Sequence, residues 1–290
     1  MEFEKIGVYN PDALYALQEI QPLEFALRSP IKRLDFIIGF LKKRKPEIVE
    51  AYVKKLEEKY GKLATKSYVD QSDIDIKKMI SDLSNLKEFP DLAKRSLNLF
   101  LNLLEIEDNT DWIKEKTKII QKNYIKSFLG PKYYNIESLV NIIEREEAVQ
   151  LYKNYITEFM IDYYKDMEDN VEDLDAFWKK RFQNYAEDES DHWVVIHSKP
   201  NKGKLIYRKD VCLWIDAMED FTDTEFKYLV CCYGDFQGAK RENKHFILTM
   251  DHTIAKGDPF CSCILHDTRI DWDLTHPPKE FWDSIWPLQE

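Results

Sequence analysis

The five cysteines of this chain are its most reactive side chains, and all of them lie between residues 212 and 263. A disulfide framework would spread cysteines along the chain, whereas none occurs in the first 211 residues. A thiolate is both a nucleophile and a metal ligand, so a cluster of thiols indicates a site rather than a framework. The cysteines are Cys212, Cys231, Cys232, Cys261 and Cys263.

The spacing of the thiols indicates which of them could act together. Cys232 and Asp235 are three residues apart, so they lie on one side of the chain if a helix or turn continues there. A carboxylate beside a thiol can take or hold a proton, although its charge also raises the thiol pKa. Cys261 and Cys263 are two apart on an expected strand and should face the same way. Cys212 is expected at the start of a helix.

Two histidines are the nearest candidates for a base or a cationic partner. They are His252 and His266. A thiolate needs a positive or hydrogen-bonding environment, and a strand or turn that places His252 near Cys261 would form a thiol–imidazole pair. A buried cysteine often acts only as a small hydrophobic residue, and a single histidine is more often structural than catalytic. Both interpretations stay open from the residues alone.

The spacings do not favour a metal or a cofactor. Structural zinc sites usually carry cysteine pairs with two to four residues between them, whereas Cys231 and Cys232 are adjacent and only Ser262 separates Cys261 from Cys263. The chain also lacks a Gly-x-Ser-x-Gly elbow, a His-Glu-x-x-His pair and a phosphate-binding loop. We therefore expect no metal and no cofactor; a metal or haem protein is a competing interpretation that an absorbance scan would reveal.

Composition limits the partners and the compartment. The net charge is -11 over 290 residues, which argues against nucleic acid as a partner because phosphate binding needs a surplus of Lys and Arg. No run of about 18 apolar residues could span a membrane, and the N-terminus lacks the features of a signal peptide. We expect a cytoplasmic protein with free thiols, a small-molecule substrate and no membrane association, and a homodimer stays open.

Hydrophobic periodicity predicts an α+β protein. A helical N-terminal part over residues 1–186 should precede a small αβ domain with a short antiparallel sheet over residues 187–290. In the first part, helices are expected after Pro46, over 97–104, and as one long helix over 139–163. Turns or caps are expected at Pro90, at 130–131 and at 168–170. In the second part, strands are expected over 193–197, 204–208, 246–250 and 260–265, helices over 211–218 and 223–230, and an aromatic strap over 272–286.

The order of the elements around the thiols resembles the L-2-amino-thiazoline-4-carboxylic acid hydrolase family over roughly the last hundred residues. Members carry a cysteine, then a Cys-x-x-Asp-Phe element, then a Thr-x-x-x-Gly-x-x-x-Cys element. These positions correspond here to Cys212, to Cys232, Asp235 and Phe236, and to Thr253, Gly257 and Cys261. The chain departs from the family pattern at His252 and at Cys263, which is an additional thiol.

The resemblance implies hydrolysis of a non-peptide C–N bond, in the named case the opening of a cyclic amidine-like thiazoline to an N-carbamoyl amino acid. In that interpretation Cys261 is the nucleophile and Asp235 transfers protons, while Cys212, Cys232 and His252 complete the catalytic group. Direct attack by water with Asp235 as base is a second mechanism. A biosynthetic ring-forming or acyl-transferring enzyme and a catalytically silent binding module are rival interpretations of the same fold. The substrate would be bound by Thr253, Cys263 and Phe236.

Overall fold

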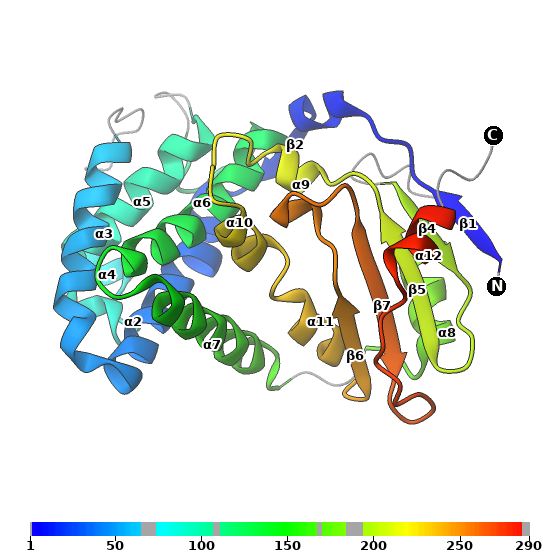
Figure 1. Cartoon of the computed structure of the whole chain (residues 1–290). Helices are drawn as coiled ribbons and strands as arrows, with labels where there is room; N and C mark the ends of the chain where they lie inside the picture. The colour runs from blue at the N-terminus through cyan, green and yellow to red at the C-terminus, as the bar shows by residue number, and fades with distance from the viewer. Residues whose placement is uncertain (1, 65–73, 107–110, 167–169, 184–193, 286–290) are drawn as a thin grey trace. The chain divides into compact units, whose positions relative to one another are not determined.

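The computed structural model describes residues 2–64, 74–106, 111–166, 170–183 and 194–285 (Figure 1). Contacts divide the chain into two compact units. The helical unit comprises Leu14–Phe159, and the sheet unit comprises Met1–Ala13 together with Met160–Glu290. The domain boundary expected after residue 186 lies outside the described residues. The combination of helices with antiparallel sheets confirms the α+β class.

The helical unit is built on long amphipathic helices whose apolar faces are buried. In α5, Leu97, Phe100 and Leu104 are buried and pack with Phe25 of α1. No helix among the described residues is both long and apolar enough to cross a bilayer. The elements of this unit are α1 (Pro22–Ala26), α2 (Lys32–Arg44), α3 (Val49–Leu63), α4 (Ile76–Met79), α5 (Pro90–Leu104), α6 (Gln121–Val140), most of α7 (Arg145–Tyr164), and the paired strands β2 (Leu17–Ile20) and β3 (Thr117–Ile120).

The proline positions confirm two expectations and overturn a third. Pro46 opens a short helical turn before α3, and Pro90 is the first residue of α5, where a missing N–H costs no helical hydrogen bond. The turn expected at residues 130–131 is wrong, because Gly130 and Pro131 lie buried within α6. Tertiary packing of this helix outweighs the cost of an internal proline.

The single long helix expected over residues 139–163 is also wrong. α6 ends at Val140 and α7 begins at Arg145. The N–H groups of Ile142 and Ile143 both bond to the carbonyl of Leu139, which closes the end of α6 and turns the chain. The side chains of these two isoleucines are apolar and continue the helical period of hydrophobic residues. The sequence pattern therefore gives no sign of the turn between α6 and α7.

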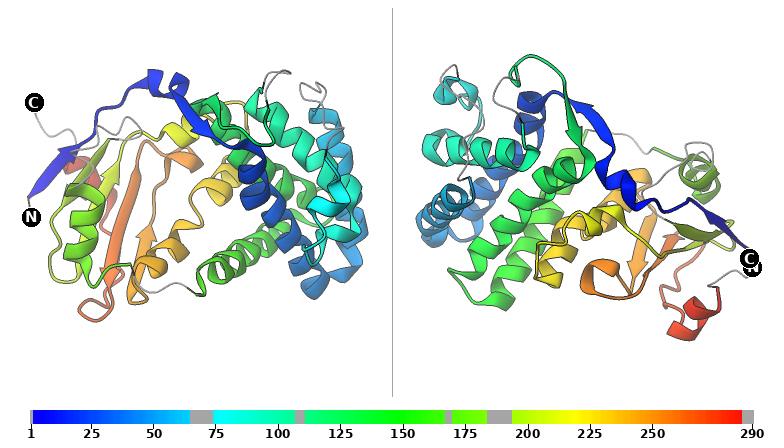
Figure 2. Two further views of the ribbon diagram at one scale, coloured as in Figure 1. Left: turned by 180° about the vertical axis from the view of Figure 1, so that it is seen from behind. Right: turned by 90° about the horizontal axis from the view of Figure 1, so that it is seen from above.

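The sheet unit contains one five-stranded antiparallel sheet in the order β1-β4-β5-β7-β6. The hairpin and the two later strands were expected, whereas β1 and α11 were not. β1 pairs at the edge of the sheet with β4, far away in sequence (Figure 2). The elements are β1 (Phe3–Ile6), β4 (Val195–Ser198), β5 (Lys204–Lys209), β6 (Phe246–Met250), β7 (Cys261–Asp267), α8 (Leu174–Trp178), α9 (Leu213–Asp216), α10 (Thr224–Cys231), α11 (Asp235–Glu242) and α12 (Lys279–Ser284).

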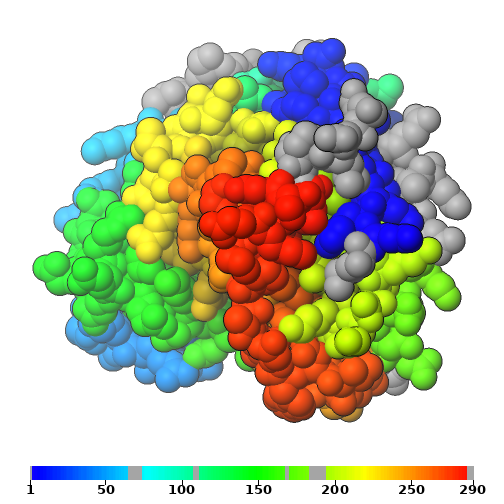
Figure 3. Space-filling view, turned by 45° about the vertical axis from the view of Figure 1, so that its right-hand side comes forward, coloured from blue at the N-terminus to red at the C-terminus, as the bar shows by residue number. Residues whose placement is uncertain are grey.

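Alternation along β5 and β7 gives the sheet two buried faces. On the site face, Leu205, Cys263 and Leu265 belong to a cluster with residues of α8 and α11. On the opposite face, Ile206 and Ile264 pack under Trp282 of α12. α12 thus packs on that opposite face, and Figure 3 shows its segment, in red, at the surface of the molecule. The site therefore lies on a sheet that is supported from behind.

We expect Trp282→Ala to lower the free energy of unfolding of the full chain by about 3–5 kcal/mol, because it empties the volume of a large, fully buried side chain. Urea titration followed by circular dichroism measures the change. Trp272→Ala is the matched control, since that side chain is 75% exposed, and it should stay within about 0.5 kcal/mol of the wild type. Equal effects of the two variants would contradict the two-faced sheet.

Candidate functional site

The register of β5 against β7 brings two reactive pairs together on the site face of the sheet. Lys209 is paired with Cys261, and Tyr207 is paired with Cys263. Side chains directly opposite each other on antiparallel strands lie on the same face and in contact range. On the other side of β5, Lys209 is paired with Val195. A lysine, a tyrosine and two thiols therefore share one patch of the sheet.

Two short helices bring the remaining thiols to each other. Cys212 precedes α9, as expected, and Cys231 ends α10. The Cys212 and Cys231 side chains are hydrogen-bonded, and this bond, with burial, raises the pKa of Cys212 well above its ordinary value. Cys231 is also hydrogen-bonded to Cys232. Cys261 contributes to the raised pKa of Cys232, and Cys212 to that of Cys261, so the structure places the three thiols that were expected to be catalytic near one another.

Asp235 is the first residue of α11 and its side chain is exposed. Its backbone N–H donates to the carbonyl of Cys232 at 2.9 Å, so a tight turn holds the two residues on one side, as the spacing predicted. The Asp235 carboxylate contributes to raising the pKa of Cys232 and of Cys261. The carboxylate and the thiols are therefore electrostatically coupled.

Burial keeps the thiols of β7 protonated at neutral pH. It raises the pKa of Cys261 to about 11, although the N–H of Ile254, 3.3 Å from Sγ, and the charge of Lys209 act in the opposite direction. Burial likewise raises the pKa of Cys263 to about 12, again opposed by Lys209. Burial alone would lower the pKa of Lys209 itself, but neighbouring acidic groups, among them the carboxylate of Asp235, raise it, so the lysine stays charged. Lys209 is the cation that favours thiolate formation here.

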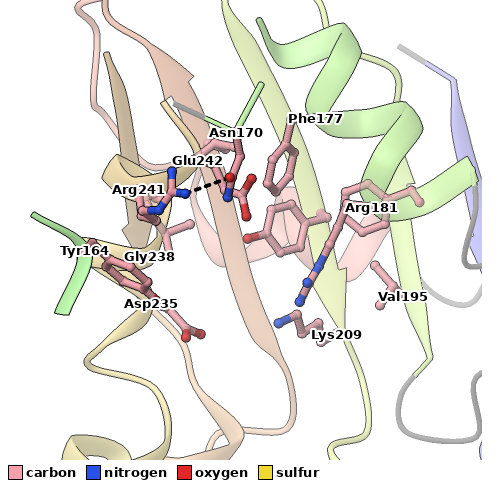
Figure 4. Close-up of a pocket in the computed structure, with 15 residues that line it drawn as sticks. Tyr164, Asn170, Phe177, Arg181, Val195, Lys209, Asp235, Gly238, Arg241 and Glu242 are labelled. Atoms are coloured by element: carbon pink, nitrogen blue, oxygen red, sulfur yellow. Dashed lines mark hydrogen bonds between the residues drawn. The ribbon is translucent and has the colours of Figure 1, made fainter. Parts of the chain in front are cut away.

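Lys209 and Tyr207 of this patch line a cavity of about 320 Å³ (Figure 4), whereas Cys261 and Cys263 lie behind its lining residues. Lys209 and Asp235 reach into it from the thiol side, and Arg181 reaches in from the π-helical turn η5 (Lys179–Gln183). The nitrogen atoms of Arg181 and Lys209 point toward each other in the cavity (Figure 4). Its apolar wall is formed by side chains of α8, η5 and the sheet, namely Phe177, Phe182, Val195, Leu248 and Leu265. The volume and lining suit a small molecule with an anionic group.

The structure places the two histidines away from the thiols. His252 Nδ1 lies 3.7 Å from Asp258, and its ring contacts Phe260. His266 is fully buried on the opposite face of β7, with its ring nitrogens at Asp271 and Thr249. Among the described contacts of these histidines, none is with Cys261. The thiol–imidazole pair considered from the sequence therefore does not form in this arrangement.

Thr253 and Gly257 build the turn that presents Cys261. The Thr253 hydroxyl accepts from the N–H of Lys256, and its own N–H donates to Asp258 at 2.7 Å. Gly257 adopts a φ of 96°, a left-handed conformation that favours glycine. The turn also directs the N–H of Ile254 at Cys261 Sγ. Thr253 is fully buried and holds this loop in shape.

The other two residues expected to bind substrate lie in the apolar layer around the cavity. Phe236 packs against the site-face cluster and edge-on to Tyr233. Cys263 is buried in the same cluster beneath Tyr207, to which its thiol is hydrogen-bonded. In the described part of the chain, no group of three or more His, Cys, Asp or Glu residues is placed to hold a metal ion.

Sequence reasoning did not identify the cationic lining of the cavity. The cations concerned are Arg181, Lys209 and Arg241. Other charged residues surround each of them in the sequence, so nothing distinguished them from ordinary surface charges. A signal existed for one of them: Leu205, Tyr207 and Lys209 alternate on β5, so a lysine is in line with a buried apolar face.

Comparison with known proteins gives one family. Residues 124–265 match the family described as L-2-amino-thiazoline-4-carboxylic acid hydrolase, which is just under half of the chain. The match confirms the resemblance and supports a hydrolase-like function at family level. It also begins in α6, well before the last hundred residues over which the resemblance was expected. No curated protein and no solved structure matches significantly.

We expect Lys209→Met to slow alkylation of Cys261, because removing the positive charge raises the thiol pKa further above about 11. Below its pKa the rate rises about tenfold per pH unit, so the variant should react about three- to tenfold more slowly with iodoacetamide near pH 9. Peptide mass mapping identifies the modified cysteine. Lys279→Met, which removes an exposed lysine of α12, should leave the rate unchanged. An unaltered rate in Lys209→Met would show that this lysine does not act on the thiol.

Proposed function

Because residues 124–265 match the L-2-amino-thiazoline-4-carboxylic acid hydrolase family, we propose that this chain hydrolyses a small cyclic amidine of the thiazoline type that carries a carboxylate. The bond acted on is the non-peptide C=N bond of the amidine, or the equivalent bond of a related amino-acid-derived ring, and in a thiazoline the ring then opens at the C–S bond to leave an N-carbamoyl product. The pairing of Lys209 with Cys261 beside the cavity carries the proposal, since it sets a cation next to the thiol of the family's last element.

The cavity offers separate places for the two parts of such a substrate. The carboxylate would lie between Arg181 and Lys209, whose nitrogens converge in the cavity (Figure 4). The ring would lie against the apolar wall that contains Phe177 and Leu248. Fixing the anionic group at one end orients the ring carbon toward the sheet, and orientation of this kind lowers the barrier of a two-centre reaction.

In the proposed chemistry Cys261 Sγ bonds to the amidine carbon of the ring. The electrons of the C=N bond move to the ring nitrogen, which takes the thiol proton, so the tetrahedral adduct forms without a free thiolate. The Asp235 carboxylate then takes a proton from a nitrogen of the adduct and delivers it to the ring sulfur, so the C–S bond breaks and the ring nitrogen stays on the carbon. Water adds to the same carbon; one of its protons goes to the C=N nitrogen, and the other passes through Asp235 to Sγ as the C–Sγ bond breaks and the carbamoyl C=O forms. Covalent catalysis thus divides one difficult step into two.

Direct attack by water is a second mechanism that one observation favours. Asp235 is exposed and lines the cavity, whereas Cys261 is buried and its pKa is raised to about 11. In this version Asp235 is the general base and the thiols form the wall of the site. Both versions hydrolyse the same substrate class.

We expect Cys261→Ala to lower kcat for L-2-amino-thiazoline-4-carboxylate by about 10³-fold or more, because the covalent route is removed. The rate of ring opening by the purified full chain, followed by chromatography of the product, measures it. Cys231→Ala is the matched control, since it removes a thiol that has no part in the proposed mechanism.

Asp235→Asn distinguishes the two mechanisms. Loss of activity in both Cys261→Ala and Asp235→Asn supports the covalent route, whereas full turnover by Cys261→Ala with loss in Asp235→Asn supports attack by water. If the wild-type chain binds the compound but neither opens the ring nor forms an adduct, the hydrolase proposal is falsified and a binding module remains.

A further inference from the structure

Three of the five cysteines form a hydrogen-bonded chain of thiols beside the site. Cys212 donates to Cys231, and Cys231 donates to Cys232. Cys212 and Cys231 are partly exposed, whereas Cys232, Cys261 and Cys263 are buried. The two thiols that a reagent from solvent can reach are therefore in direct contact with each other, and the proposed mechanism uses neither of them.

Backbone hydrogen bonds fix the positions of both partly exposed cysteines. Cys212 precedes α9, and its carbonyl accepts from the N–H groups of Ile215 and Asp216 at 3.0 and 3.1 Å. Cys231 is the last residue of α10, and the N–H of the residue that follows it donates to the carbonyl of Tyr228 at 2.9 Å. Two thiols that meet on fixed backbones have a high effective concentration toward each other, which favours a disulfide between them.

We propose that Cys212 and Cys231 form a reversible disulfide, which makes this thiol pair a redox-sensitive modification site. The oxidant is a small disulfide of the glutathione type, and the reductant that reverses the modification is the corresponding thiol. This inference does not depend on the proposed hydrolysis, because the cross-link forms between residues that take no part in it.

Two exchange steps produce the bond. The hydrogen bond between the two thiols lowers the pKa of Cys231 and raises that of Cys212, so Cys231 is the attacking sulfur. It loses its proton and bonds to one sulfur of glutathione disulfide, whose S–S bond breaks and whose other half leaves and takes the proton. Cys212 then loses its proton and bonds to the Cys231 sulfur, and the second glutathione leaves with that proton. Two electrons and two protons have passed from the cysteines to the glutathione disulfide, which becomes two thiols.

Oxidation of the pair also changes the hydrogen bonding of the neighbouring thiol. In the disulfide, Cys231 has no proton to donate to Cys232. The carbonyl of Cys232 accepts from the N–H of Asp235 at 2.9 Å, so this thiol belongs to the turn that carries the cavity carboxylate. The modification site therefore adjoins the candidate site.

Peptide mapping of the full chain after equilibration with glutathione tests the cross-link. Mixtures of reduced and oxidised glutathione at about pH 8 are left until the composition is constant, because exchange is slow where thiols are protonated. Acid then stops the exchange, and the remaining thiols are alkylated. Trypsin releases Cys212 in the peptide 210–227 and Cys231 in the peptide 228–240. A bond between them joins the two peptides, whereas a bond between Cys231 and Cys232 stays within one peptide.

The equilibrium constant of this exchange has units of concentration and measures the effective concentration of one thiol at the other. We expect it to exceed about 10 mM, above the millimolar values of flexibly linked groups. Cys231→Ser should abolish the joined peptide. Cys263→Ser, a matched substitution on β7 outside the chain of thiols, should keep the wild-type constant, and circular dichroism verifies the fold of both variants.

Three results would overturn the proposal: a lower constant, a joined peptide that survives Cys231→Ser, or a bond between Cys231 and Cys232 in its place. A chain that forms the cross-link but opens no ring would overturn the hydrolase alone and leave the redox-sensitive pair established.

Discussion

Backbone hydrogen bonds between β5 and β7 determine which side chains can meet above the sheet. The register pairs Lys209 with Cys261 and Tyr207 with Cys263, and a slip of one residue would turn all four side chains to the opposite face. Two features stabilise this register. Trp282 packs against β5 and β7 from behind the sheet, and the turn held by Thr253 leads into β7. η5 and α11 carry the other cations of the cavity, and they pack over the face of the sheet that this register determines.

Burial of Cys261 has a direct consequence for its chemistry. At pH 7 a thiol with a pKa of about 11 is ionised in about one molecule in 10⁴. The N–H of Ile254 and the charge of Lys209 oppose the rise in the Cys261 pKa that burial causes, but they do not cancel it. In the proposed covalent mechanism, attack by Cys261 must therefore be coupled to removal of its proton, for which an amidine nitrogen is a suitable acceptor.

Short-range patterns in the sequence predicted most of the strands of the sheet unit. Short runs of β-type residues, with a turn signal between the first two, predicted the hairpin of β4 and β5 and the strand β6, because strand and turn propensities are local information. β1 could not be found in this way, since Phe3 pairs with Ser198 and four residues of modest hydrophobicity do not identify so distant a partner. α11 was missed because its sequence, with Gly238 and several charges, carries few apolar positions. Of the candidate site, the thiols and Asp235 were predicted from their clustering, whereas the position of Arg181 beside the cavity depends on packing that no local pattern reveals.

The position of β1 makes the sheet unit discontinuous in sequence, since the whole helical unit lies between β1 and the remaining strands. During synthesis the chain emerges from its N-terminus, so β1 is made first but its partner β4 follows about 190 residues later. The helical unit, whose contacts are all available earlier, can fold in the interval. β1 can pair only after β4 has been synthesised, so completion of this edge of the sheet requires a long-range contact between residues 3–6 and 195–198.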